Sequence, residues 1–160
     1  MLLSPVDDPD DKARDPVTDS EHHRRLERLY AAAPVTRWYG STLRVDDGRA
    51  EVRLAVRSEF HHAMRAVHGS VYFRLLDDAA FFAANSRVAD VLVLTVSFTV
   101  HFARPVTEGE LRAVGQLVHE GGRLLMAQAQ LFDADQQLVA HGSGVFSRSR
   151  VPLDGGPGGA

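Results

Sequence analysis

The sequence predicts an α+β fold in which an antiparallel sheet of about six strands wraps round one long central helix. The helix is expected from Gly69 to Ser86, a stretch with no proline and no glycine after its first residue. Apolar residues occur nearly all round this stretch, which indicates that the helix is buried. The segments on either side alternate between apolar and polar residues, as strands do, and their short connections favour antiparallel pairing.

The elements are expected in the order helix, two strands, central helix, four strands. Ser20 is suited to cap a first helix that ends at Ala33, before Pro34. Asp46-Asp47-Gly48 lies between two alternating runs and predicts a hairpin turn. A histidine-rich connection over residues 57–68 precedes the central helix. In chain order, the strands are expected at residues 37–45, 49–56, 91–103, 110–119, 123–132 and 137–148.

The run over residues 91–103 alternates well, and successive side chains of a strand point to opposite faces. We therefore expect one apolar face and one polar face. The apolar face is expected to carry Leu92, Leu94, Val96, Phe98, Val100 and Phe102, and the polar face Thr95, Ser97, Thr99 and His101.

Length and composition fit a single domain over residues 20–150 with a tail on each side. The 160 residues are 44% hydrophobic and 24% charged, which is ordinary for a globular protein. Residues 1–19 are rich in aspartate and proline, so we expect this acidic tail to be disordered. Residues 151–160, rich in glycine and proline, are expected to form a flexible tail.

Composition also excludes several classes of partner and site. The net charge of −3 gives no reason to expect nucleic acid as a partner. No run approaches the ~18 apolar residues of a membrane span and no signal peptide is evident, so we expect a cytoplasmic protein with no membrane partner. Without cysteine, neither disulfides nor Cys-based metal sites can form. The eight histidines lack HExxH-type spacing, so no metal is expected, and most should lie on the surface or in connections.

Two adjacent carboxylates, Asp77 and Asp78, fall in the middle of the central helix. A buried charge is costly unless it is paired or used in chemistry. Arg74 precedes Asp78 by four residues and can pair with it, and Asp77 is close enough along the helix to share that pair. The pattern alone favours a catalytic carboxylate and a structural Arg–Asp cluster about equally.

The helix begins with His68-Gly69-Ser70. The N–H groups of a first helical turn lack intrahelical partners and lie at the positive end of the helix dipole. Such a turn can polarise a carbonyl or hold an oxyanion. The alternative is structural, with Gly69 serving a tight turn and Ser70 a cap.

These residues resemble the phenylacetic-acid-degradation (PaaI-like) family of hotdog-fold thioesterases. The run from His68 to Ala80 is similar to the His-Gly-Gly…Leu-x-Asp/Glu helix of that family, and Thr95 to Pro105 to its strand ending in Arg-Pro or Ser-Pro. Gly122-Arg123 and residues 138–142 also fit its last two strands. The resemblance covers roughly residues 35–148 and implies a hotdog fold.

The resemblance implies a catalytic set at the start and middle of the central helix. Asp77, nine positions after the motif His68, corresponds to the catalytic carboxylate. The backbone N–H that polarises the thioester carbonyl lies at the turn of Gly69 and Ser70. Thr95 corresponds to a hydroxyl that orients water in some members of the family.

Three positions depart from the family pattern. His62 stands where an Asn or Gln often helps to bind the thioester, and it retains the ability to donate a hydrogen bond. Ser70 and Arg65 each stand where a glycine is usual. No cofactor is implied, because coenzyme A is part of the substrate.

Helix geometry predicts a site shared between subunits. Asp77 lies eight residues after Gly69, which is about 12 Å along a helix at ~1.5 Å per residue. One thioester carbon cannot lie ~3 Å from both groups of one helix. Antiparallel helices about a two-fold axis would bring Asp77 of one chain to Gly69 of the other, so we expect a homodimer or a homotetramer.

Coenzyme A also carries phosphates, and the sequence has no phosphate-binding loop. Arg104, at the end of a strand, and Arg123, after a tight turn, are candidate phosphate ligands, although both also suit an ordinary solvated strand end. The favoured function is hydrolysis of an acyl-CoA thioester. The alternatives are a non-catalytic acyl-CoA-binding or regulatory protein and, further behind, an enoyl-CoA hydratase or dehydratase.

Overall fold

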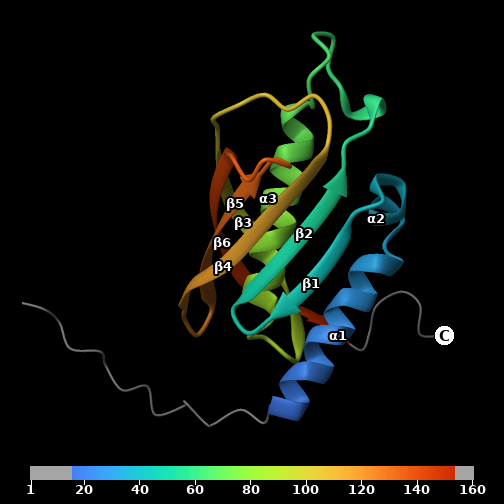
Figure 1. The fold of residues 1–160 in the computed structure, drawn as a ribbon. Coiled ribbons are helices and arrows are strands. Elements are labelled where there is room, and N and C mark those ends of the chain that lie inside the picture. The colour runs from blue at the N-terminus through green and yellow to red at the C-terminus, as the bar shows by residue number, and fades with distance from the viewer. Residues whose placement is uncertain (1–15, 154–160) are drawn as a thin grey trace, which may run out of the picture.

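The computed structural model describes residues 16–153, so residues 1–15 and 154–160 of the two expected tails lie outside the described residues. The expected element order is confirmed (Figure 1). The elements are α1 (Pro16–Ala32), α2 (Pro34–Tyr39), β1 (Thr42–Asp46), β2 (Arg49–Ala55), a 3₁₀ turn (Ser58–Phe60), α3 (Gly69–Asn85), β3 (Val91–Phe102), β4 (Glu110–Glu120), β5 (Leu124–Phe132) and β6 (Leu138–Pro152).

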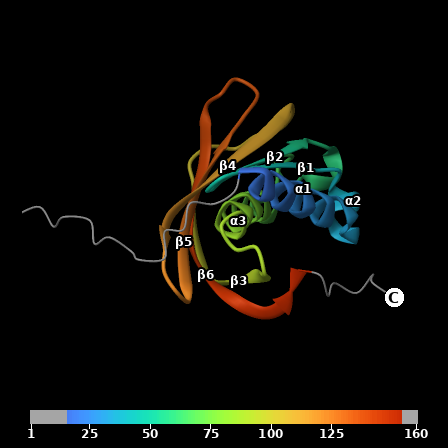
Figure 2. The same ribbon diagram turned by 90° about the horizontal axis from the view of Figure 1, so that it is seen from below.

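The six strands form one antiparallel sheet in the order β1-β2-β4-β5-β6-β3. The sheet curves round α3, as the view along that helix shows (Figure 2). Gly115 of β4 allows the closest approach, because a Cβ atom there would overlap the backbone carbonyl of Ala79. Small residues at this crossing let the helix backbone pack directly on the sheet. This is the predicted fold, a hotdog sheet round a central helix.

The N-terminal elements differ from the sequence prediction in two places. The first helix begins at Pro16, not at Ser20, and so includes four residues expected to be disordered. The strand predicted from Arg37 begins only at Thr42, because residues 34–39 form α2. Pro34 opens this helix, where a missing N–H is harmless, and Gly40 ends it at φ 73°.

A β-bulge in β3 corrects the expected division of its faces. The pairing with β6 shifts between Thr95 and Ser97, which leaves Val96 as the extra residue. An extra residue breaks the two-residue period, so side chains beyond it change faces. Thr95 and Phe98 therefore both face α3, although simple alternation places them on opposite faces. Leu94, before the bulge, faces outward and is exposed.

Helix α1 packs on β1 and on the end of α3 (Figure 1). Its side chains Leu26 and Tyr30 belong to the core. His22 and His23 are buried, whereas the other six histidines are exposed or half-buried, so most histidines lie where they were expected. The His22 ring lies 2.9 Å from the Asn85 carbonyl oxygen at the end of α3. No helix in residues 16–153 combines the length and apolar character that crossing a membrane requires.

Candidate active site

The structure brings Asp77 and Thr95 together on the side of α3 that faces β3. The Thr95 hydroxyl donates a hydrogen bond to Asp77 Oδ1 over 3.0 Å. Burial raises the pKa of the Asp77 carboxyl, and the bond from Thr95 offsets part of that increase. The bulge at Val96 makes this contact possible because it turns Thr95 toward the helix. A half-buried carboxylate with a hydroxyl beside it can activate or position water.

Asp78 points to the other side of α3 and has structural partners. Arg74 Nε lies 3.2 Å from its Oδ2, which confirms the predicted i,i+4 pair. The Tyr30 hydroxyl donates to the same oxygen over 3.1 Å and lies 2.6 Å from Ser41 Oγ. Burial raises the pKa of Asp78 to about 6, against the lowering effects of Arg74 and Tyr30. The two neighbouring aspartates therefore have separate surroundings.

The first turn of α3 is capped by its own motif histidine. Ser70 N–H donates to His68 Nδ1 over 3.1 Å, and Ser70 Oγ lies 2.7 Å from the same nitrogen. Val71 N–H donates to the His68 carbonyl over 2.9 Å. Gly69 N–H is therefore the first-turn donor for which the described residues provide no acceptor. Of the two residues expected to polarise a carbonyl, Ser70 already has a partner and Gly69 does not.

Gly69 lies directly against an aromatic ring. A Cβ atom at this position would come within 3.2 Å of two ring carbons of Phe102. The absent side chain thus leaves room for Phe102 beside the free N–H. Phe73, one turn further along α3, is 42% exposed and packs edge-to-face on Phe98 at 5.7 Å. The surface between Gly69 and Asp77 is therefore aromatic and partly open.

The connection before α3 places His62 next to His68, with ring centroids 6.4 Å apart. His62 Nδ1 accepts a hydrogen bond from Met64 N–H over 3.0 Å, and the ring is exposed. Arg65 has φ 61°, in the left-handed region that glycine adopts without strain. The resemblance assigns a glycine to this position, and the backbone has kept the glycine conformation despite the arginine.

The two candidate phosphate ligands lie at opposite ends of α3 within one chain. Arg104 is at the start of the helix, where its carbonyl accepts a bond from the Tyr72 hydroxyl over 3.3 Å. Arg123 is in the β4–β5 turn, and its carbonyl accepts from Arg148 N–H over 3.1 Å. Both side chains are exposed, and neither forms an ion pair with any described residue. One chain alone does not bring them together.

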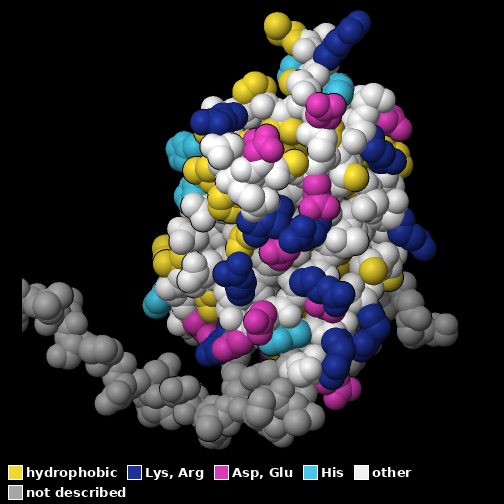
Figure 3. Space-filling model, viewed as in Figure 1, with side chains coloured by type: hydrophobic (Ala, Val, Ile, Leu, Met, Phe, Trp, Pro, Cys, Tyr) yellow, Lys and Arg dark blue, Asp and Glu magenta, His cyan; other side chains and the backbone are white. Residues whose placement is uncertain are grey.

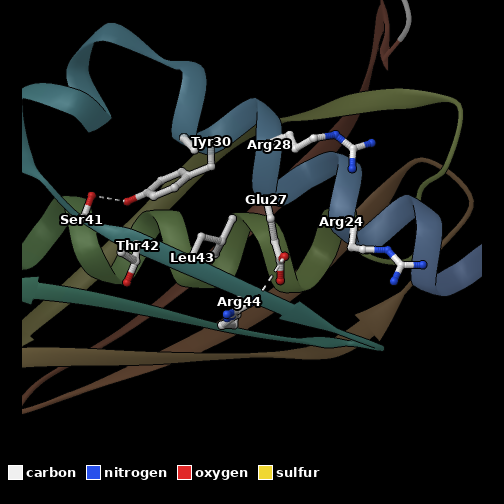
Figure 4. Close-up of a pocket in the computed structure, with 9 residues that line it drawn as sticks. Arg24, Glu27, Arg28, Tyr30, Ser41, Thr42, Leu43 and Arg44 are labelled. Atoms are coloured by element: carbon white, nitrogen blue, oxygen red, sulfur yellow. Dashed lines mark hydrogen bonds and ion pairs between the residues drawn. The ribbon is translucent and has the colours of Figure 1, made fainter.

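A groove of about 460 Å³ lies between α1 and β1, on the Asp78 side of α3 (Figure 4). Its lining includes Tyr30, which bonds Asp78, but neither Asp77 nor Gly69. Basic and acidic side chains are interspersed on this face (Figure 3). The groove is lined by Arg24, Glu27, Arg28, Tyr30, Ala31 and residues 41–44. Residues 16–153 contain no group of three His, Asp or Glu side chains placed to hold a metal.

The sequence did not indicate the partners of the two carboxylates beyond Arg74, and Thr95 was expected only to orient water. Tyr30 of α1 contacts Asp78, and Thr36 of α2 accepts a hydrogen bond from Arg74. Ser41, between α2 and β1, contacts the Tyr30 hydroxyl and so reaches Asp78 only through Tyr30. No local pattern signals such contacts, because they depend on how the N-terminal helices pack on α3. Phe102 beside Gly69 is similarly a tertiary contact, although its place on an apolar strand face was expected.

Comparisons with known proteins agree with this architecture. The sequence profile described as the thioesterase superfamily matches residues 64–140. The acyl-coenzyme A thioesterase PaaI of Escherichia coli is 28% identical over 97 residues, which are 60% of this chain and 68% of PaaI. A conserved protein from Pseudomonas aeruginosa superposes with TM-score 0.71 at 28% identity, over 76% of this chain and 98% of that one. The PaaI structure superposes with TM-score 0.77 at 22% identity, over 84% and 98%, which establishes the shared fold.

Proposed function

Because the chain belongs to the thioesterase superfamily of hotdog-fold proteins, we propose that it hydrolyses the thioester bond of an acyl-coenzyme A. The observation that carries the proposal is the half-buried Asp77 carboxylate with the Thr95 hydroxyl at 3.0 Å, on the open side of the central helix. A free N–H at Gly69 supplies a second group that the reaction needs. The absence of cysteine from the sequence suits a reducing compartment, and we place the activity in the cytoplasm.

In the proposed reaction, Gly69 N–H donates to the thioester oxygen and stabilises the negative charge that develops there. Asp77 takes a proton from water, and the water oxygen forms a bond to the carbonyl carbon. Thr95 can accept a hydrogen bond from the same water while it donates to Asp77. The carbon–sulfur bond then breaks, and the coenzyme A thiolate takes up a proton. Direct attack by the Asp77 carboxylate, followed by hydrolysis of an anhydride, is the other route open to the same residues.

The proposed site is completed by a second subunit. Strand β3 is an edge of the sheet, with backbone groups open to pair with another strand. Phe73 beside it is 42% exposed, so this face of α3 also has room for a neighbour. Antiparallel pairing of two β3 edges would place two α3 helices side by side in opposite directions. Asp77 of one chain would then face Gly69 of the other, giving two sites per homodimer, and two dimers could assemble as a homotetramer.

His62 and the two exposed arginines are proposed to bind substrate. His62 is next to His68 at the start of α3 and can donate a hydrogen bond to the acyl-CoA. Arg104 is at that same end of the helix and is the nearer phosphate ligand within one chain. Arg123 is at the other end of α3. In the antiparallel dimer that end lies beside the start of the partner's α3, so Arg123 would bind phosphate at the site there.

The capping of Ser70 N–H by His68 supports one alternative, a non-catalytic acyl-CoA-binding protein. Such a protein would have one donor fewer for a developing oxyanion and would retain its binding surfaces. The hydratase or dehydratase alternative has no observation of this kind in its favour.

Hydrolysis of a panel of acyl-CoA thioesters by wild type, Asp77→Asn and Asp78→Asn tests the proposal. Asp77→Asn keeps the size of the side chain but cannot act as base or nucleophile, so kcat should fall by about 10²–10⁴-fold. Asp78→Asn is the matched control and should retain most of the kcat. Binding of acyl-CoA without turnover by the wild type would support the non-catalytic alternative. An Asp77→Asn variant with full kcat would rule out this catalytic role.

A further inference from the structure

An aromatic cluster joins α2 to the connection that precedes α3. Trp38 packs edge-to-face on Tyr39 at 4.8 Å and on Phe60 at 5.8 Å, and Tyr39 stacks on Phe60 at 5.2 Å. The Arg57 guanidinium lies over the Trp38 ring at 5.5 Å and over the Phe60 ring at 4.5 Å. One of its nitrogens donates to the Trp38 carbonyl over 2.7 Å. The Trp38 ring is therefore held in a fixed position.

This cluster leaves its largest ring open. Trp38 is 57% exposed even with Arg57 over it, which is unusual for the largest aromatic side chain, because tryptophan is highly buried on average. Arg57 Nε is buried and has no hydrogen-bond partner. Neither Arg57 nor the neighbouring Arg37 has a carboxylate within ion-pair distance among the described residues. An exposed indole face thus lies beside the guanidinium of Arg57, which forms no ion pair with a carboxylate of the described residues.

The cluster is connected to the start of the central helix. The Phe60 carbonyl accepts a hydrogen bond from His68 N–H over 2.8 Å, so the backbone under the cluster is one residue from Gly69. His62 and His68 lie on the same connection. An extended chain on a ligand bound at Trp38 could therefore reach the free Gly69 N–H.

From this arrangement, and resting on the proposed function, we infer that Trp38 stacks on the adenine of the acyl-CoA substrate while Arg57 faces its phosphates. A flat aromatic ring gains from stacking on the face of a nucleobase, and guanidinium groups suit phosphate oxygens. The pantetheine arm would then run along the connection toward Gly69.

Trp38 is the only tryptophan in the chain, so its fluorescence reports directly on this surface. We expect coenzyme A and adenosine 3′,5′-bisphosphate to quench the emission in a saturable way, and pantetheine to leave it unchanged. This titration needs no turnover, so it tests the nucleotide site even if the chain proves not to hydrolyse thioesters. An emission that the bisphosphate does not affect would overturn the inference. If the emission changed only when the protein was diluted, Trp38 would instead lie in a contact between copies of the chain.

Kinetics provide the second test. Trp38→Ala should raise KM for acyl-CoA on the order of 10-fold, the effect of losing a base–aromatic stack, with kcat nearly unchanged. KM for the matching acyl-pantetheine should not change, and Trp38→Phe should recover part of the loss. Val35→Ala, at an exposed apolar position of the same helix, is the control and should behave as wild type. Equal losses on both substrates would show that Trp38 only holds α2 in place, and would refute the inference.

Discussion

The hydrogen bond from Thr95 to Asp77 should set the pH at which the protein becomes active. Thr95→Val removes the donor and keeps the shape of the side chain. Because the bond stabilises the ionised carboxylate, its loss should raise the pKa of Asp77 further above its ordinary value. The acidic limb of kcat/KM, where activity appears as Asp77 loses its proton, should therefore move to higher pH.

The size of this shift follows from the contact. A hydrogen bond to a charged group contributes about 1.5–3 kcal/mol, and one pKa unit corresponds to about 1.4 kcal/mol, so full loss would give roughly 1–2 units. Thr95 is exposed and water can replace part of the bond, so we expect the lower end, about 1 unit.

The assay is the pH profile of kcat/KM for acyl-CoA hydrolysis by wild type, Thr95→Val and Thr99→Val. Thr99 lies on the same strand beyond the bulge and pairs with Ser143 on the exposed side, so it is a matched control. A Thr95→Val profile that is lower but has its acidic limb at the wild-type pH would refute the idea that this bond tunes Asp77. The residual loss on the alkaline plateau would measure how far Thr95 positions water.

Three further predictions concern stability and assembly. The pKa of Asp78 is about 6 in the folded chain against 3.8 for the free group, so the folded state binds more protons between these values. The free energy of unfolding should therefore fall by up to about 2 kcal/mol as pH rises from about 4 to about 6, and Asp78→Asn should flatten this decline in urea titrations. A variant with the wild-type slope would contradict the assignment. Arg65→Gly should raise the free energy of unfolding by about 1 kcal/mol, because glycine adopts the left-handed conformation at φ 61° without strain. Arg65→Ala, which keeps a Cβ atom, should not raise it. An equal effect of both variants would exclude strain as the cause. Mixing inactive Asp77→Asn and Gly69→Leu subunits should restore about one quarter of the wild-type activity if each site takes one group from each chain. No recovery after subunit exchange, verified by native mass spectrometry, would count against a shared site.

Much of the fold followed from patterns that are local in the chain. The central helix was predicted to within one residue of α3, and the hairpin at Asp47-Gly48 joins β1 and β2 as expected. These signals are strong because burial on all sides and tight turns each restrict which residues can occur. The Arg74–Asp78 pair was also predictable, since it depends only on helical spacing.

The departures arise where a neighbouring element decided the outcome. Residues 37–39 were expected to begin a strand, but in the structure they complete α2, and Tyr39 stacks on Phe60 of the connection. The bulge at Val96 leaves no clear mark in the alternation of β3, because apolar residues continue on both sides of it. Pairing with β6 determines where the extra residue is accommodated.

The sequence by itself determined the central helix, the two carboxylates on it, the glycine at its start and the six-stranded antiparallel sheet. The tertiary structure decided which carboxylate faces which surroundings. Tyr30 and Arg74 surround Asp78, whereas the bulge delivers Thr95 to Asp77. The physical reason is that spacing fixes only the angle between neighbouring side chains on a helix, about 100° per residue. Whether a side chain on the helix points into the core or into the active site depends on the elements that pack against that side of the helix. Those elements come from distant parts of the chain.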